Sequence, residues 1–394
     1  MVIRIALYSH DSVGLGHVRR NVALAHALNT ALPELLGEEV TGMLITGQSS
    51  ATAFEAPPGW DWLALPGVTT GEDGYRPRHL DLELRTLTDL RGGVVGASLA
   101  AFAPDLVIVD RHPFGVHGEL EPALRALRAA DPSAVVVLGL RDVLDRRSAT
   151  RAEWKAVGGA SAVRELFDAV WVYGDPSVHD PVATGEIPEG LRDLVTHTGF
   201  LANGRLGSGH SVAEEPFVLT TVGGGSDGRA IAEAAVRAAV PAGFRHVVVT
   251  GPQMPAEHRR AIRAAAGPST TVVRSVPDAL ALLRRASAVV SMGGYNTVCE
   301  VMSTTAPSLV VPRSSRRQEQ RLRAEALERR GAVQVLEEGA VTPERLGDWF
   351  ARSVGSTVLR AGIDLDGLSA VGPLAADLIA AARGTAQKEA DRAV

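Results

Sequence analysis

The segment from Gly293 to Glu300 has the residue types of a nucleotide-binding turn. An apolar stretch precedes Gly293 and Gly294, and a helical pattern of apolar residues begins with Asn296 and Thr297, which are favourable helix N-caps. Such a junction directs backbone N–H groups and the positive end of a helix dipole toward a bound anion. Glu300, one turn into the helix, is placed to accept hydrogen bonds from a ribose diol. The segment therefore predicts a nucleotide site.

Two further segments of the second half fit the same site. The apolar strand 217–222 leads into Gly223–Gly228 and an alanine-rich helix, which predicts a second anion cradle at a helix start. Another strand, 308–312, precedes an arginine-rich loop and then Glu319 and Gln320. Phosphate binding and a solvated helix face remain open for the arginines of this region, which are Arg313, Arg316, Arg317, Arg321 and Arg323.

The first half offers a histidine and a carboxylate at strand ends. Strand 2–8 runs into a loop with Gly14 and Gly16, and His17 stands where the next helix begins. The spacing is not Gly-x-Gly-x-x-Gly, so a dinucleotide fingerprint is not indicated. Asp110 ends the buried strand 104–110, and the carboxyl ends of parallel strands face the ligand in open α/β sheets. We expect His17 and Asp110 to be partners, with a helix cap or packing role as the alternative for each.

Composition and charge exclude several classes of protein. The net charge of −5 argues against a nucleic-acid binder. The single cysteine, Cys299, excludes a disulfide framework and a cysteine-based zinc site, and we expect it to be a small buried residue. The sequence shows no signal peptide and no run near the ~20 apolar residues of a membrane helix. We expect a cytoplasmic protein, with peripheral membrane contact left open.

Strand and helix patterns alternate along all 394 residues. This alternation predicts βαβ units and mainly parallel sheets, in two domains because the chain is too long for one. We expect a first domain over 1–203, a second over 204–375, and a C-terminal helix and tail over 376–394 that could cross back to the first domain. Two details are a polar loop over 67–75 and a long helix over 79–99, interrupted at Gly92-Gly93.

These motifs together carry a family resemblance. The order Gly-Gly-x-Asn-Thr-x-x-Glu, a strand ending in proline, Gln-Glu-Gln and then Gly331-Ala332 resembles the donor half of the MurG-type glycosyltransferases of family 28. Residues 223–228 resemble the loop that holds the donor's diphosphate in that family, and the loop that ends in His17 resembles its first glycine-rich turn. The resemblance implies the GT-B fold, in which two Rossmann-like domains with mainly parallel sheets face each other across a cleft.

The resemblance also implies an activity and its residues. The expected enzyme is an inverting, metal-independent glycosyltransferase that uses a UDP-sugar, first UDP-N-acetylglucosamine, and a small-molecule or lipid-linked acceptor. Related GT-B enzymes suggest His17 as the catalytic base and Asp110 as its orienting partner. Val276 would offer backbone contacts to uracil, Glu300 would hold the ribose, and Glu319 and Gln320 would contact the sugar. The full set expected to bind the nucleotide sugar is Gly14, Gly16, Gly224, Gly225, Ser226, Val276, Gly293, Gly294, Asn296, Thr297, Glu300, Glu319 and Gln320.

Alternatives remain open at this point. Glu319 stands where the family usually has glutamine, and this departure leaves the identity of the donor sugar open. A nucleotide-sugar 2-epimerase shares the fold but needs a pair of carboxylates that the sequence does not place, and a silent nucleotide-sugar-binding protein would have no use for His17 and Asp110. The only plain Asp-x-Asp pair, Asp364 and Asp366, does not follow a strong strand, so no metal is expected. Arg141 and Asp142 either line the acceptor site or pair with each other.

Overall fold

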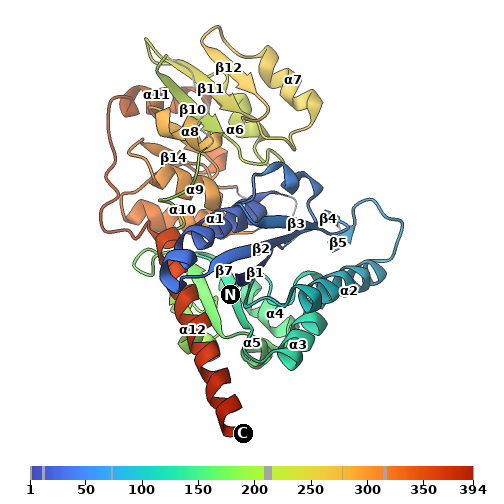
Figure 1. Cartoon of the computed structure of the whole chain (residues 1–394). Coiled ribbons are helices and arrows are strands. Elements are labelled where there is room, and N and C mark those ends of the chain that lie inside the picture. The colour runs from blue at the N-terminus through green and yellow to red at the C-terminus, as the bar shows by residue number, and fades with distance from the viewer. Residues whose placement is uncertain are drawn as a thin grey trace. The chain divides into compact units, whose positions relative to one another are not determined.

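The structure is a computed structural model that describes residues 2–10, 14–71, 74–207, 215–276, 278–313 and 317–393. It divides into two compact units (Figure 1). Unit 1 comprises 1–174, 180–204 and 366–394, and unit 2 comprises 175–179 and 205–365. The C-terminal segment that was expected over 376–394 therefore returns to unit 1 earlier in the chain, at residue 366. The reason is that helix α12, Gly367–Ala393, begins well before residue 376 and belongs to unit 1 along its whole length.

Unit 1 contains a seven-stranded sheet in its described part, and all of its pairs are parallel. The strand order is β3-β2-β1-β6-β7-β8-β9. The strands are β1 Val2–Tyr8, β2 Glu39–Thr46, β3 Trp60–Ala64, β6 Leu106–Asp110, β7 Val135–Arg141, β8 Ala169–Tyr173 and β9 Val195–His197. The strands β6, β7 and β8 are nearly continuous apolar runs, which suit a sheet that is covered on both faces.

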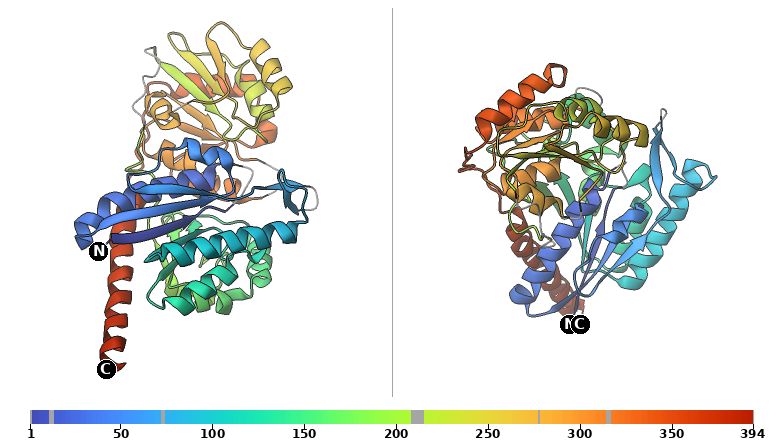
Figure 2. Two further views of the ribbon diagram at one scale, coloured as in Figure 1. Left: turned by 45° about the vertical axis from the view of Figure 1, so that its right-hand side comes forward. Right: turned by 90° about the horizontal axis from the view of Figure 1, so that it is seen from above.

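Helices cover the two faces of this sheet. Helix α1 packs against α12, and α2 packs against α3, on opposite sides of the sheet (Figure 2). Gly372 permits the first contact, because a Cβ there would lie 2.4 Å from the Cβ of Ala31. Arg383 then ties α12 to Glu38 and Asp105, at 2.6 and 2.9 Å. The helices are α1 Gly16–Leu36, α2 Leu84–Phe102, α3 Glu121–Ala130, α4 Arg147–Ala156 and α5 Gly159–Leu166, with 3-10 turns η1 Ser49–Ala53, η2 Val116–Gly118 and η3 Glu189–Leu194.

Two expectations for unit 1 are wrong. The region 67–75 contains strand β4, Val68–Gly71, which forms an antiparallel hairpin with β5, Gly74–Pro77, rather than a plain loop. Helix α2 starts at Leu84 instead of 79 and is not interrupted at its glycines. Gly92 has a packing role there, since a Cβ would lie 2.6 Å from the carbonyl oxygen of Glu119.

Unit 2 repeats the design with a six-stranded parallel sheet in the order β12-β11-β10-β13-β14-β15. Alternate residues of β10 enter separate apolar clusters: Val218 joins one, and Phe217 and Leu219 join the other. This alternation shows that both faces of the sheet are covered. Cys299 is fully buried, as expected.

The elements of unit 2 have the following bounds. The strands are β10 Phe217–Thr221, β11 Arg245–Val249, β12 Thr270–Val273, β13 Val289–Ser291, β14 Ser308–Val310 and β15 Gln334–Val335. The helices are α6 Arg229–Ala235, α7 Ala256–Ala264, α8 Ala279–Arg285, α9 Tyr295–Met302, α10 Glu319–Arg329 and α11 Pro343–Ser353, with a 3-10 turn η4 at Glu338–Ala340.

Each sheet has a point where the chain reverses its direction of winding. In unit 1 the chain goes from β1 outward to β2 and later returns to β6 on the other side of β1; in unit 2, β10 has the same position between β11 and β13. Ligands of open α/β sheets bind at the carboxyl ends of the two strands that flank such a switch point. Ligand sites are therefore expected at the four loops that follow β1, β6, β10 and β13.

Candidate active site

The switch point of unit 1 brings His17 and Asp110 together. Strands β1 and β6 are parallel neighbours, so the helix that follows β1 starts beside the end of β6. His17 is in the first turn of α1, and Asp110 is the last residue of β6. The Nδ1 atom of His17 bonds to Oδ2 of Asp110, as the sequence predicted. Gly14 and Gly16 frame the turn before His17, and both are half-buried.

A third charged group, which the sequence analysis missed, completes this contact. Arg20, also on α1, donates from Nε to Oδ1 of Asp110 at 3.0 Å and makes a second bond to the same oxygen from Nη2. Its Nη2 lies 3.0 Å from Nδ1 of His17. The side chain of Asp110 is completely buried, whereas that of His17 keeps 12% of its surface exposed. The ring is therefore the member of the group that a substrate can reach.

The charges around Asp110 and His17 set their protonation. Burial alone would raise the pKa of Asp110, but the neighbouring Arg20 and His17 lower it to about 2. Burial lowers the pKa of His17; Asp110 opposes this effect, and the positive charges of Arg20 and Arg141 lower the pKa further. The helix N-terminus adds a positive potential of the same sign. At neutral pH the site therefore holds an ionised carboxylate and a neutral imidazole.

This charge state fixes the tautomer of His17. An ionised carboxylate only accepts hydrogen bonds, so Nδ1 carries the proton that it donates to Asp110. The other ring nitrogen, Nε2, is left with its lone pair. A neutral imidazole held in this way can take a proton from a substrate hydroxyl.

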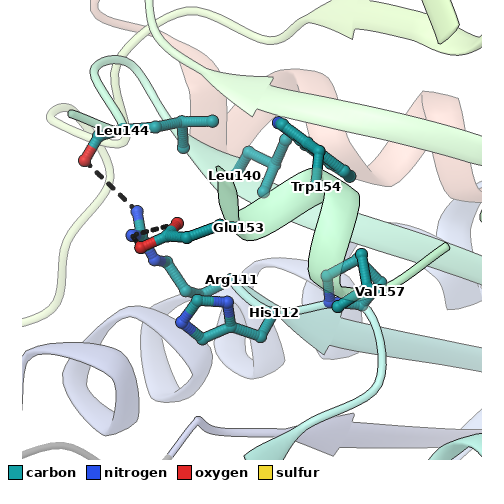
Figure 3. A pocket seen from close by; sticks show the side chains of 8 residues that line it. Arg111, His112, Leu140, Leu144, Glu153, Trp154 and Val157 are labelled. Carbon is teal, nitrogen blue, oxygen red and sulfur yellow. Dashed lines mark hydrogen bonds and ion pairs between the residues drawn. The ribbon is translucent and has the colours of Figure 1, made fainter. Parts of the chain in front are cut away.

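Aromatic rings extend the site from His17 toward a hollow in unit 1. The ring of His10 lies 5.7 Å from that of His17 and 4.5 Å from that of His112. Nε2 of His10 also lies 2.9 Å from the hydroxyl of Tyr75, on the β4–β5 hairpin. His112 borders a small hollow that is partly open to solvent (Figure 3). The hollow is lined by Arg111, His112, Pro113, Leu140, Leu144, Glu153, Trp154 and Val157.

The charged residues of the hollow neutralise each other. Arg111 donates to a carboxylate oxygen of Glu153 at 3.1 Å and to the carbonyl oxygen of Leu144 at 3.3 Å, as Figure 3 shows. Arg111 has φ of 77°, in the left-handed region that non-glycine residues rarely adopt. This turn after β6 directs the Arg111 side chain at Glu153, and apart from His112 the remaining lining residues are apolar. Of the pair left open by the sequence, Asp142 is buried, and Arg141 adds its charge near His17.

The switch point of unit 2 carries the glycine-rich loop after β10. Gly223 and Gly225 have φ of 59° and 92°, and a Cβ at position 225 would lie 2.2 Å from the carbonyl oxygen of Thr250. The loop therefore requires glycine on both conformational and steric grounds. Gly224 and Ser226 are exposed at its tip. Their backbone is accessible to a bound anion.

The loop after β13 lies beside it at the same switch point. Gly293 has φ of 73°, and Gly294 caps α9. The expected N-cap roles of Asn296 and Thr297 are wrong, because both residues are inside the first turn of α9. Asn296 is buried and accepts from Nη2 of Arg205 at 3.0 Å instead.

Glu300, the expected ribose ligand, is almost fully buried and close to a cation. Its Oε1 lies 3.7 Å from Nη1 of Arg205, the first residue of the second segment of unit 2. This ion pair places a positive charge beside the carboxylate of Glu300. No local pattern pointed to Arg205, since it is in a polar, glycine-rich stretch far from Glu300 in the chain.

Arg313 links the remaining expected ligands to the glycine-rich loop. Its guanidinium donates to Asp227 at 3.2 Å and to Glu319 at 3.1 Å, and its backbone N–H donates to Oε1 of Gln320 at 3.2 Å. Glu319 is buried, and Gln320 is half-buried. Arg313 thus connects Asp227, at the end of the glycine-rich loop, to Glu319 and Gln320 at the start of α10.

The other residues of this region have varied roles. Arg323 is buried, donates to the carbonyl oxygen of Gly293 at 3.2 Å and lies over the ring of Tyr295, so the idea of a solvated face is wrong for it. Arg321 does lie on an exposed face and pairs with Glu325. Val276 packs on the apolar cluster of β10 and α8. Arg316 is outside the described residues.

The described residues contain no group of three or more histidine, cysteine, aspartate or glutamate side chains suited to a metal ion. Within the same residues, no helix has the length and apolar character needed to cross a bilayer. Asp366, of the expected acidic pair, accepts from Asn203 at 2.8 Å, and the backbone N–H of Asp364 donates to Asp175.

Comparison with known proteins agrees with this architecture. Residues 219–352 match the profile of the glycosyltransferase family 28 C-terminal domain. The calicheamicin glycosyltransferase CalG4 has a similar structure, with a TM-score of 0.56, 16% identity and 98% of both chains covered. VinC, solved in complex with DTDP, gives a TM-score of 0.56 at 18% identity over 98% of both chains. MurG of Acinetobacter baumannii gives 0.52 at 15% identity over 95% of both chains.

No curated protein sequence matched the chain. The structural likeness establishes the GT-B fold, with two Rossmann-like units, and the family profile covers most of the second unit.

Proposed function

We propose that the chain is an inverting, metal-independent glycosyltransferase, which the family 28 C-terminal domain profile over 219–352 and the GT-B fold support. In this proposal unit 2 binds a UDP-sugar, first UDP-N-acetylglucosamine, and unit 1 binds the acceptor and supplies the base. The observation that carries the proposal is the partly accessible ring of His17, held through Nδ1 by the buried Asp110. A silent binding protein has no need of such a group.

The proposed reaction is one displacement at the anomeric carbon. Nε2 of His17 takes the proton of an acceptor hydroxyl while its oxygen forms a bond to C1 of the sugar. The bond from C1 to the diphosphate oxygen breaks on the opposite face, and its electron pair leaves with the nucleotide diphosphate. Asp110 stabilises the imidazolium that results. Attack opposite to the leaving group inverts the configuration at C1.

The glycine loops of unit 2 would bind the donor. Backbone N–H groups of 224–226 and of the start of α9 would stabilise the charge that develops on the diphosphate. Glu300 would accept hydrogen bonds from the ribose, and Gln320 and Glu319 would contact the sugar. Arg313 donates hydrogen bonds to the side chains of Glu319 and Gln320, so these two side chains are positioned before a ligand binds.

Two features bear on the identity of the substrates. VinC was solved with DTDP, which makes dTDP-sugars the second candidate class of donor. The hollow beside His112 has apolar and aromatic walls and internally paired charges. The proposed acceptor is a hydroxyl of a natural product or a cell-envelope precursor, and the apolar and aromatic side chains beside His112 suit an acceptor with an apolar body.

The test is a thermal-shift panel of UDP-, dTDP-, GDP- and ADP-sugars, with and without EDTA. A ligand that binds only the folded protein raises its Tm. We expect one UDP-sugar to raise the Tm, EDTA to have no effect, and Glu300→Ala to abolish the shift. Failure of every nucleotide to raise the Tm would contradict the donor site, and a shift lost with EDTA would contradict metal independence.

A further inference from the structure

We propose that Arg20 is a positioning residue of the His17–Asp110 site, which holds the carboxylate in place and keeps the imidazole uncharged with Nε2 available to the acceptor. This inference rests on the proposed function of His17 as a base. It adds a third member to what the sequence presents as a pair.

The helix places Arg20 where it can act on both partners. His17 and Arg20 are three residues apart on α1, so their side chains share one face of the helix. Arg20 directs Nε and Nη2 at Oδ1 of Asp110, and Oδ2 remains for the ring of His17. The carboxylate plane is thereby fixed by two donors on one oxygen, and this orients the ring that bonds to the other.

The same contact changes the charge that His17 experiences. A histidine beside an isolated buried carboxylate gains a favourable interaction in its protonated form. Here the guanidinium of Arg20 neutralises that carboxylate and lies against Nδ1 of the ring. A proton added to Nε2 would therefore create an imidazolium next to a buried cation.

The remaining groups around the ring do not reverse this effect. Arg141, from β7, adds a positive charge. His10, from the end of β1, contributes the edge of a neighbouring ring at 5.7 Å. Tyr173, from β8, lies under the guanidinium of Arg20, with its ring centroid at 5.8 Å from Cζ. Burial raises the pKa of Tyr173, so its hydroxyl stays protonated and uncharged at neutral pH.

A purely structural ion pair is the competing explanation, and unit 1 contains a matched control. Arg91 and Glu119 form a fully buried pair, with Nε to Oε2 at 2.6 Å and Nη2 to Oε1 at 2.8 Å. This pair has the same chemistry and burial as Arg20 and Asp110 but no bond to His17. Arg91→Gln therefore reproduces the loss of a buried arginine without touching the proposed base.

The experiment measures the pKa of His17 by NMR in the full chain labelled at histidine, with His17→Gln to assign its signal. Arg20→Gln is expected to raise the pKa of His17, and Arg91→Gln to leave it unchanged. The acid limb of kcat/KM should move upward in Arg20→Gln by the same amount, with a tenfold loss per pH unit below the new pKa. An unchanged pKa in Arg20→Gln, or equal shifts in both variants, would overturn the proposal.

A second variant covers the case in which Arg20→Gln does not fold. Arg20→Lys keeps the charge but cannot direct two parallel donors at Oδ1. It should lower kcat on the pH plateau while the Kd of the donor stays unchanged; an unchanged kcat would count against positioning. The NMR titration needs no turnover. A chain that transfers no sugar but shows the Arg20→Gln shift would refute the proposed function and leave the role of Arg20 intact.

Discussion

Three side chains of unit 1 together form the proposed base, and each contributes a different property. His17 is the accessible member, Asp110 is buried and ionised, and Arg20 compensates the charge of Asp110. The lowered pKa of His17 means that its neutral, active form persists below pH 6.5, the ordinary pKa of a histidine. Activity that depends on this base should rise with pH through a value below 6.5 and then remain level.

Asp110→Asn tests the orienting role directly. The amide NH₂ of asparagine can donate to Nδ1, which favours the tautomer with the proton on Nε2 and so removes the lone pair that acts as base. We expect kcat/KM to fall by about 100- to 10,000-fold, with the Kd of the donor unchanged because the donor site is in unit 2. A loss of less than about threefold in steady-state kinetics would show that Asp110 does not set the tautomer.

The loops of unit 2 act as one element because arginines connect them. Arg313 joins the glycine-rich loop to the start of α10, and Arg323 joins α10 to the loop after β13. The two loops and the start of α10 are therefore connected to one another before a donor binds. A preorganised site loses less conformational entropy on binding and gains affinity in proportion.

Arg313→Gln should weaken donor binding for this reason. It removes the charge-assisted bonds to Asp227 and Glu319, and we expect the Kd measured by calorimetry to rise about tenfold, which corresponds to ~1.4 kcal/mol. Arg321→Gln is the matched control, because Arg321 also pairs with a glutamate but on the exposed face of the same helix. Equal effects of the two substitutions would indicate a general loss of charge instead of a loss of preorganisation.

The two units of the molecule share one arrangement of sheet and loops. Each has a parallel sheet with its candidate residues on the loops that flank a switch point. The sequence showed this much because strands that end in glycine, histidine or aspartate are visible as local patterns. His17, Asp110 and the loops after β10 and β13 were predictable on that ground.

The contacts that the sequence did not show are long-range ones. Arg205 reaches Glu300, and Arg313 reaches Asp227, across segments that no local periodicity relates. The β4–β5 hairpin was missed because its strands are short and polar. Arg20 did leave a local signal, since it is an arginine on the buried face of α1 that also carries Leu24 and Leu28. A charge on such a face needs a buried partner.

The stereochemistry of the product shows whether His17 acts as a base in a single displacement. Proton NMR can identify the first anomer released when the protein slowly hydrolyses the nucleotide sugar that it binds, with water as acceptor. If His17 is the base of a single displacement, the first sugar released has the configuration opposite to that of the donor, and Asp110→Asn slows its release. Release of the retained anomer first would contradict single displacement and the role assigned to His17.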